Sequence, residues 1–270
     1  MSNLVQRTIT GIIFLAIVIT AIAVSKITFL ILFLLIIIGS MYELFVLSGK
    51  DSITPLKIYG ILVGIIIFLA NYFYVNKILS AKCFLLIIPL IIGVFIIELY
   101  RKSEQPFTNI GFTLLGLLYI AVSLSFANYI VIDDQLNYNP YLLLGFFFLM
   151  WSYDTLAYVF GISFGKHRLF ERISPKKSWE GFIGGSVSTI GIAYVVSIIF
   201  PELRFFDWAI VAIIASVAGT FGDLVESSFK RSIDEKDSGR LLPGHGGVLD
   251  RFDAVLFALP LFFVYLQLIH

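Results

Sequence analysis

The chain has 270 residues, of which 59% are hydrophobic and 14% charged, with a formal net charge of +1 and a mean hydropathy of +0.96. Soluble domains carry about 45–50% apolar and about 25% charged residues, so this composition excludes a soluble globular core. The single cysteine, Cys83, excludes an internal disulfide and any metal or redox site built on paired cysteines.

Nine apolar runs follow one another along the chain, each long enough to cross about 30 Å of hydrocarbon as a helix. We expect membrane helices near 8–25, 28–47, 58–76, 83–99, 109–132, 141–161, 179–200, 208–228 and 249–269. No linker or repeat separates them, which predicts one continuous all-α membrane domain, a polytopic bundle of about nine transmembrane helices. Residues 1–140 would hold about five N-terminal spans, and residues 141–270 the C-terminal helices with polar loops 162–178 and 229–248.

The first run has a second interpretation. Arg7, the apolar stretch after it and the small residues Ala21 to Ala23 also resemble a cleavable signal peptide. The run is long for such a peptide and many spans follow it, so we favour a retained helix. Cleavage would leave the remaining spans in the same orientation.

The basic residues predict the orientation of the bundle. With a cytoplasmic N-terminus, 15 of the 19 Lys and Arg residues fall on the inner side. The outer side then carries only Lys26, Lys77, Lys82 and Arg204. This asymmetry fits the positive-inside rule, so we expect both polar loops in the cytoplasm.

Acidic residues occur at a similar depth on three of the expected helices. Asp154 lies near the inner end of the sixth run, Asp223 near that of the eighth, and Asp250 and Asp253 open the ninth. At 1.5 Å per residue, each lies roughly 0 to 12 Å below the inner surface. A charge at the bilayer centre costs about 2.5 to 3.5 kcal/mol, so this grouping predicts partner cations or a wet cavity.

The eighth run places polar side chains on one helical face. Asp223, Glu226, Ser227 and Lys230 follow the spacing i, i+3, i+4 and i+7. Hard carboxylate oxygens in such an arrangement suit Mg²⁺, which takes one or two protein carboxylates and completes its octahedron with water and phosphate. Intramembrane salt bridges are the alternative. In that case Asp250 or Asp253 of the ninth run would form an ion pair with Arg231, Lys230 or Arg251.

Two polar loops contain further candidate residues. Leu242 to Gly247 form a glycine turn before a helix N-terminus, an arrangement that can bind an anion but is also common in ordinary loops. His245 in this turn is either a general acid or base or a hydrogen-bonding brace, and we favour the brace. In the other loop, Lys176 and Lys177 would clamp a triphosphate or a lipid head group, unless they only mark the inner side of the membrane.

The start of the seventh run carries local signals. Ser178, with Glu180 in the first turn, predicts a helix N-cap. Gly181, Gly184 and Gly185 are typical of close packing between membrane helices.

The polar segments together resemble a known family. Residues 228–231, 236–239 and 242–253 resemble the signature of the phosphatidate cytidylyltransferases, the CDP-diacylglycerol synthases. Residues 174–181 resemble that family's second motif, with Ser178 where many members have threonine, and residues 151–158 also look familial. The resemblance covers about residues 150 to 255, whereas the first five spans match only as generic hydrophobic helices.

This resemblance implies an enzyme that converts CTP and phosphatidate to CDP-diacylglycerol and pyrophosphate. Mg²⁺ would be the cofactor, with room for a second cation, at the cytoplasmic face of a bacterial plasma membrane. CTP, phosphatidic acid and membrane lipid would be its partners, without DNA or RNA, and a homodimer through transmembrane helices stays open.

The resemblance also assigns roles to residues. The metal ligands would be Asp223 and Asp250, with Asp253 and Asp154 as further candidates. The catalytic residues would be Asp223, Asp250, Lys230, Arg231 and Asp253. The substrate would be bound by Ser174, Lys176, Lys177, Ser228, Lys236, Asp237, Arg240, Gly244, His245, Gly246, Gly247 and Arg251.

Two other functions fit parts of the pattern. A CTP-dependent polyprenol or phytol kinase would need the same membrane, metal and basic loops, but it would leave CDP rather than pyrophosphate. A cation-coupled transporter would also bury acids, but near the bilayer midplane on broken helices in paired repeats. The acids of this chain lie toward the cytoplasmic side, and no repeat is visible.

Overall fold

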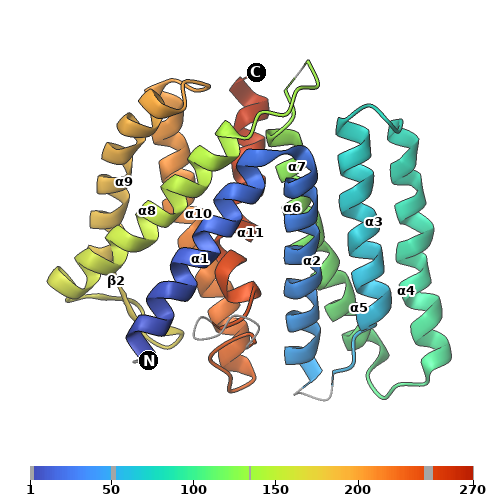
Figure 1. The fold of residues 1–270 in the computed structure, drawn as a ribbon. Helices are drawn as coiled ribbons and strands as arrows, with labels where there is room; N and C mark the ends of the chain where they lie inside the picture. The colour runs from blue at the N-terminus through green and yellow to red at the C-terminus, as the bar shows by residue number, and fades with distance from the viewer. Residues whose placement is uncertain (1–2, 50–52, 134, 240–245, 270) are drawn as a thin grey trace. The chain divides into compact units, whose positions relative to one another are not determined.

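The computed structural model describes residues 3–49, 53–133, 135–239 and 246–269. The α-helices are α1 (Asn3–Val24), α2 (Lys26–Ser48), α3 (Lys57–Val75), α4 (Ile87–Arg101), α5 (Pro106–Leu115), α6 (Ser123–Ser125), α7 (Ala127–Ile130), α8 (Tyr141–Phe164), α9 (Trp179–Ile199), α10 (Phe205–Ser232) and α11 (Leu249–Ile269). A 3₁₀ helix, Ala81–Leu86, precedes α4, and a π-helical segment, Gly116–Val122, joins α5 to α6. Two short strands, β1 (Arg168–Phe170) and β2 (Ser174–Ser178), complete the fold (Figure 1).

The helices confirm a polytopic membrane protein. Within the described ranges, 8 helical segments are long and apolar enough to cross a membrane. They match the expected runs from the second to the ninth. The first run forms α1, whose apolar stretch within the described side chains is Ile9–Val24.

The chain divides into two compact units, which are described separately. The first contains Met1–Tyr138 with Ile233–Phe252, and the second contains Asn139–Ser232 with Asp253–His270. The ranges expected from the sequence, 1–140 and 141–270 within one continuous membrane domain, stay a prediction.

Aromatic side chains form the core of the first unit. Phe33 and Phe68 stack with ring centroids 6.1 Å apart, and Phe29 packs on Phe33 at 4.6 Å. Farther along α2, the ring of Phe45 would collide with any side chain at Gly60 of α3 or at Gly116 of the π-helical segment. Small residues let membrane helices approach closely, so these glycines allow α2 to pack tightly against its neighbours.

A buried carboxylate ties the α2–α3 connection to two later helices of the first unit. Glu98 of α4 accepts hydrogen bonds from Asn109 Nδ2 at 2.7 Å and from Arg101 Nη1 at 3.0 Å. Asn109 Oδ1 in turn accepts from the backbone N–H of Thr54 at 2.7 Å, and Arg101 donates to the carbonyl of Thr54 at 2.6 Å. This network fixes the segment that begins α3.

Glycines bring α8 and α9 of the second unit into backbone contact. A Cβ atom on Gly185 would meet the backbone of Ala157, and one on Gly181 would lie 3.1 Å from the Cα atom of Gly161. A side chain at Gly184 would collide with Phe160. The predicted close-packing role of the three glycines is confirmed.

The connection between α8 and α9 is a β-hairpin, whereas the sequence analysis expected a polar loop in an all-α fold. Strands β1 and β2 pair antiparallel, with Arg168 opposite Ser178 and Phe170 opposite Ser174. The carboxylate of Glu180 holds the base of the hairpin. It accepts from the backbone N–H groups of Lys166 at 3.1 Å and His167 at 3.2 Å, and it lies 2.6 Å from His167 Nδ1. The local hydropathy of so short a pair of strands gave no signal for it.

The core of the second unit contains Trp208, which is fully buried against Gly145. Its indole N–H donates to the carbonyl of Phe200 at 2.9 Å. We expect Gly145→Ala to force its methyl group into this ring and to destabilise the unit by about 1 to 3 kcal/mol, the usual cost of overpacking. Thermal unfolding in detergent measures the effect. Gly191→Ala is the control, because nothing lies within 4 Å of its added Cβ, and an equal loss in both variants would contradict the packing explanation.

Candidate functional site

Helix α10 brings together the polar face that the sequence predicted. Ser227 Oγ donates to Asp223 Oδ1 at 3.1 Å, and Lys230 Nζ lies 2.5 Å from Glu226 Oε2. Glu226 is 2% and Lys230 8% exposed. The predicted spacing on one helical face is confirmed, and the lysine sits next to the acid whose buried charge it balances.

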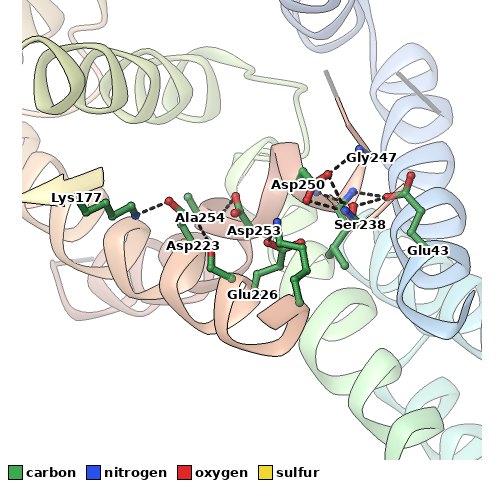
Figure 2. A network of polar contacts seen from close by, with 12 residues as sticks. Glu43, Lys177, Asp223, Glu226, Ser238, Gly247, Asp250, Asp253 and Ala254 are labelled. Carbon is green, nitrogen blue, oxygen red and sulfur yellow. Dashed lines mark hydrogen bonds and ion pairs between the residues drawn. The ribbon is translucent and has the colours of Figure 1, made fainter. Parts of the chain in front are cut away.

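Strand β2 contributes a second lysine to this face. Lys177 forms an ion pair with Asp223 Oδ2 (Figure 2). The side chains are 27% and 37% exposed, so the pair lies at the edge of the buried region rather than inside it. The hairpin therefore delivers a cation to the carboxylate that the sequence analysis placed first among the metal ligands.

Asp253 of α11 lies beside the same group of charges. It is 8% exposed, and its Oδ1 accepts from the backbone N–H of Ala254 at 2.7 Å. The charges that act on its carboxylate belong to Asp223, Glu226 and Lys230. Helix α11 approaches so closely because Gly222 has no side chain: a Cβ there would lie 3.0 Å from the Cα atom of Ala254.

Five residues thus form one group in the second unit, the acid–lysine cluster: Lys177, Asp223, Glu226, Lys230 and Asp253. Asp154 lies on α8 near the edge of this group. The charges of Asp154 and Asp223 both act on the hydroxyl of Tyr153, which is hydrogen-bonded to Thr220 Oγ1 at 2.5 Å. Three helices and a strand therefore converge on one group of acidic and basic side chains.

Asp250 belongs to the first unit and holds backbone there. Its carboxylate accepts from the backbone N–H of Ser238 at 2.9 and 3.0 Å and from that of Gly247 at 2.7 Å. Its own N–H donates to Ser238 Oγ at 3.3 Å. Gly246 has a φ of +81°, which only glycine adopts freely. These bonds fix Ser238 and Gly247 relative to each other. We name the described residues 238–239 and 246–249 the glycine loop.

The remaining predicted residues lie at several levels of exposure. Exposed side chains are those of Lys176, Arg231, Lys236, Asp237 and Arg251. Ser174 and Ser228 are half-buried. Arg240, Gly244 and His245 lie outside the described residues, so the proposed brace at His245 stays a prediction.

The family model described as the Cytidylyltransferase family matches residues 5–269. The chain belongs to the cytidylyltransferase family. Similar curated proteins are the phosphatidate cytidylyltransferases of Staphylococcus haemolyticus and Staphylococcus saprophyticus, each 43% identical over 162 residues. That of Staphylococcus epidermidis is 42% identical over 162 residues. The alignments cover 59% of this chain and 60% of each relative, so the chain spans about three fifths of the length of the curated relatives it matches.

The donor set of this cytidylyltransferase-family chain fits a hard divalent cation. Among the described residues, no group of three or more His, Cys, Asp and Glu side chains is spaced as a closed metal cage. Mg²⁺ needs only one or two protein carboxylates and takes its other ligands from water and phosphate. The carboxylate of Asp223 already has a cation, the ammonium of Lys177, against its open oxygen. A divalent cation bound there would have to take the place of Lys177, because two positive charges on one carboxylate oxygen repel each other.

Sequence reasoning missed one acidic residue of this cytidylyltransferase-family chain. Glu43 of α2 is 3% exposed, and its Oε2 accepts from Ser238 Oγ at 3.0 Å and from the backbone N–H of Leu249 at 2.9 Å (Figure 2). The signal was present in the sequence, because Glu43 is the single acidic residue of the apolar helix Lys26–Ser48. An ionisable residue inside a membrane span usually has a partner and a function.

Proposed function

We propose that this chain is a phosphatidate cytidylyltransferase, which transfers CMP from CTP to phosphatidate. An oxygen of the phosphatidate phosphomonoester bonds to the α-phosphorus of CTP, the bond from that phosphorus to the bridging oxygen of the β-phosphate breaks, and pyrophosphate leaves. The observation that carries the proposal is the acid–lysine cluster, which is formed by membrane-spanning helices and strand β2 of a cytidylyltransferase-family chain. From such a position, the side chains of the cluster can contact both the phosphate of a membrane lipid and the triphosphate of a nucleotide.

The residues of the cluster suit this chemistry better than they suit proton transfer. A phosphate monoester is already an anion near neutral pH, so the attacking oxygen needs little help from a general base. The reaction needs positioning and neutralisation of phosphate charge instead. Lys177 and Lys230 supply positive charge, and Glu226 keeps Lys230 in place through a 2.5 Å ion pair.

Mg²⁺ would be held by Asp223, with Asp253 and Asp154 on neighbouring helices of the same unit. Asp250 belongs to the first unit, and its role as a metal ligand stays a prediction. When bound, the ion supplies charge neutralisation for the triphosphate. Lys177 would then exchange its contact with Asp223 for a phosphate oxygen. The glycine loop, held by Asp250, would present backbone N–H groups to the nucleotide, as glycine turns before helix N-termini commonly do.

We also propose that the N-terminus and both polar loops face the cytoplasm of a bacterial plasma membrane. The positive-inside distribution of Lys and Arg supports this orientation. CTP is a cytoplasmic nucleotide, and the acyl chains of phosphatidate can stay in the surrounding lipid while its head group reaches the cluster.

The experiment that tests the function uses the purified full chain in detergent–lipid micelles with phosphatidate, Mg²⁺ and labelled CTP. We expect pyrophosphate release and α-³²P label in a lipid product, both dependent on Mg²⁺ and on phosphatidate. A lipid kinase would instead transfer γ-³²P to the lipid and leave CDP. If monodisperse protein transfers label to lipid from neither α-³²P-labelled nor γ-³²P-labelled CTP, the proposal is refuted.

The two lysines of strand β2 offer a matched pair for a further prediction. Lys177 is paired with Asp223, whereas Lys176 is exposed. We expect Lys177→Ala to lower kcat/KM for CTP by more than tenfold, beyond the ~0 to 1 kcal/mol typical of exposed charges, and Lys176→Ala to have the smaller effect. Initial rates of pyrophosphate release give both values. Near wild-type activity in the double variant would contradict phosphate binding by these lysines and would leave them only the role of marking the inner side of the membrane.

A further inference from the structure

Glu43 is an acid that the proposed chemistry does not use. It lies in α2, one of the N-terminal spans, which contribute no residue to the acid–lysine cluster. The residue is 3% exposed. Burial of a carboxylate is costly unless hydrogen bonds compensate for the lost water, so the contacts that Glu43 makes indicate what the side chain is for.

The carboxylate of Glu43 ties together both ends of the glycine loop. Its Oε2 accepts from Ser238 Oγ at 3.0 Å, where the loop begins, and from the backbone N–H of Leu249 at 2.9 Å, where the loop ends. Leu249 is also the first residue of α11. The N–H groups of a first helical turn have no partner within the helix, and a negative charge there is favourable, so Glu43 acts as a distant cap of α11.

The glycines of the loop leave room for this carboxylate. A Cβ atom on Gly239 would collide with Glu43 Oε1, and one on Gly247 would collide with Glu43 Oε2 and with Ser238 Oγ. Asp250 completes the arrangement by accepting from the backbone N–H groups of Ser238 and Gly247. Ser238 is thus held through its side chain by one acid and through its backbone by another.

We propose that Glu43 is a positioning residue of the active site: it sets the conformation of the glycine loop and the start of α11 without touching substrate. This inference rests on the proposed function, which assigns the loop to the nucleotide. It gives the N-terminal helices a catalytic purpose, because α2 supplies a buried acid that the loop residues cannot provide for themselves.

The test compares Glu43→Gln with Glu98→Gln. Glu98 is a matched control, since it is 1% exposed, lies in the same unit and binds Asn109 and Arg101 far from the glycine loop in sequence. We expect Glu43→Gln to lower kcat/KM for CTP about 10- to 100-fold, the scale of a misplaced binding group. Glu98→Gln should lower the thermal unfolding temperature at least as much and leave kcat/KM within about twofold of wild type.

A double-variant cycle with Ser238→Ala tests the route of the effect. If Glu43 acts through Ser238, the combined variant should lose less than the product of the two single losses, because the residues share one interaction. Hydrogen exchange at the Leu249 amide gives a readout independent of catalysis. We expect it to accelerate in Glu43→Gln and to stay unchanged in Glu98→Gln.

The outcomes separate the inference from the function on which it rests. A wild-type chain without pyrophosphate release refutes the proposed function, and the Leu249 amide then still decides whether Glu43 holds the loop. Wild-type kcat/KM in Glu43→Gln overturns the inference. So does a parallel loss of activity and stability in both glutamine variants. If Glu43→Gln prevents membrane insertion, Ser238→Ala alone must show the loss of kcat/KM and the faster exchange, and wild-type values in it overturn the proposal.

Discussion

Asp223→Asn is expected to reduce pyrophosphate release by at least about 100-fold, while the protein stays folded and inserted. The substitution keeps the shape of the side chain but removes the charge that attracts Lys177 and, in the proposed function, Mg²⁺. Preorganised charge at a reacting phosphate is among the largest contributions to catalysis, and the loss of a single interaction of this kind costs about 100- to 1,000-fold. Initial rates at saturating Mg²⁺ and CTP measure the effect.

Asp207→Asn is the control for this experiment. Asp207 lies in the first turn of the same helix, α10, and accepts a hydrogen bond from Tyr265 at 2.7 Å. Asp207 is remote along the helix from the acid–lysine cluster, so the Asp207→Asn substitution should affect stability alone. If Asp223→Asn retains more than about a tenth of wild-type turnover, Asp223 is not the principal ligand of a catalytic cation.

Asp250→Asn is expected to lose about as much activity, through the glycine loop. Both carboxylate oxygens of Asp250 accept from backbone N–H groups, those of Ser238 and Gly247. The asparagine variant has an NH₂ group in place of one carboxylate oxygen, and this group cannot accept from a backbone N–H. A hydrogen bond lost in this way costs about 1 to 3 kcal/mol. The loop would lose its fixed conformation, and we expect turnover to fall roughly 100-fold.

A titration with Mg²⁺ separates the two roles of Asp250. A ligand role predicts that the variant needs more Mg²⁺ for half-maximal rate, whereas a loop role predicts a higher KM for CTP at an unchanged Mg²⁺ requirement. The control is Asp234→Asn, an exposed position of the same segment whose φ of +56° suits asparagine as well as aspartate. Equal rates for Asp250→Asn and this control would contradict both roles.

The spans could be predicted from the sequence because a helix in hydrocarbon must present apolar side chains on most of its surface. The run 208–228 is present as α10, but the helix continues to Ser232. Hydropathy marked the end too early because Lys230 is polar, although Glu226 one turn earlier keeps it buried within the helix. The helical face of Asp223 and its neighbours followed from spacing alone, since helical periodicity is a local property.

Long-range partners could not be predicted in the same way. Glu43 and Ser238 are 195 residues apart in the chain, and no local pattern connects them. The same is true of Lys177 and Asp223, which the sequence assigned to separate tasks, phosphate and metal, before the structure placed them in one ion pair. The hairpin that carries Lys177 was missed because strands of so few residues leave no periodic signal.

The lipid-facing character of the helices affects how the rates of this protein must be expressed. In the spans Ala81–Arg101 and Trp179–Ile199, few residues are fully buried within the protein, so in a membrane their apolar side chains can contact acyl chains. A substrate carried in that lipid is encountered by diffusion in the membrane plane, and its availability is a mole fraction of the bilayer. A nucleotide is encountered from bulk solution and is counted in molar units. Under the proposed function, added inert lipid or detergent will therefore raise the apparent KM for phosphatidate by surface dilution and leave that for CTP unchanged.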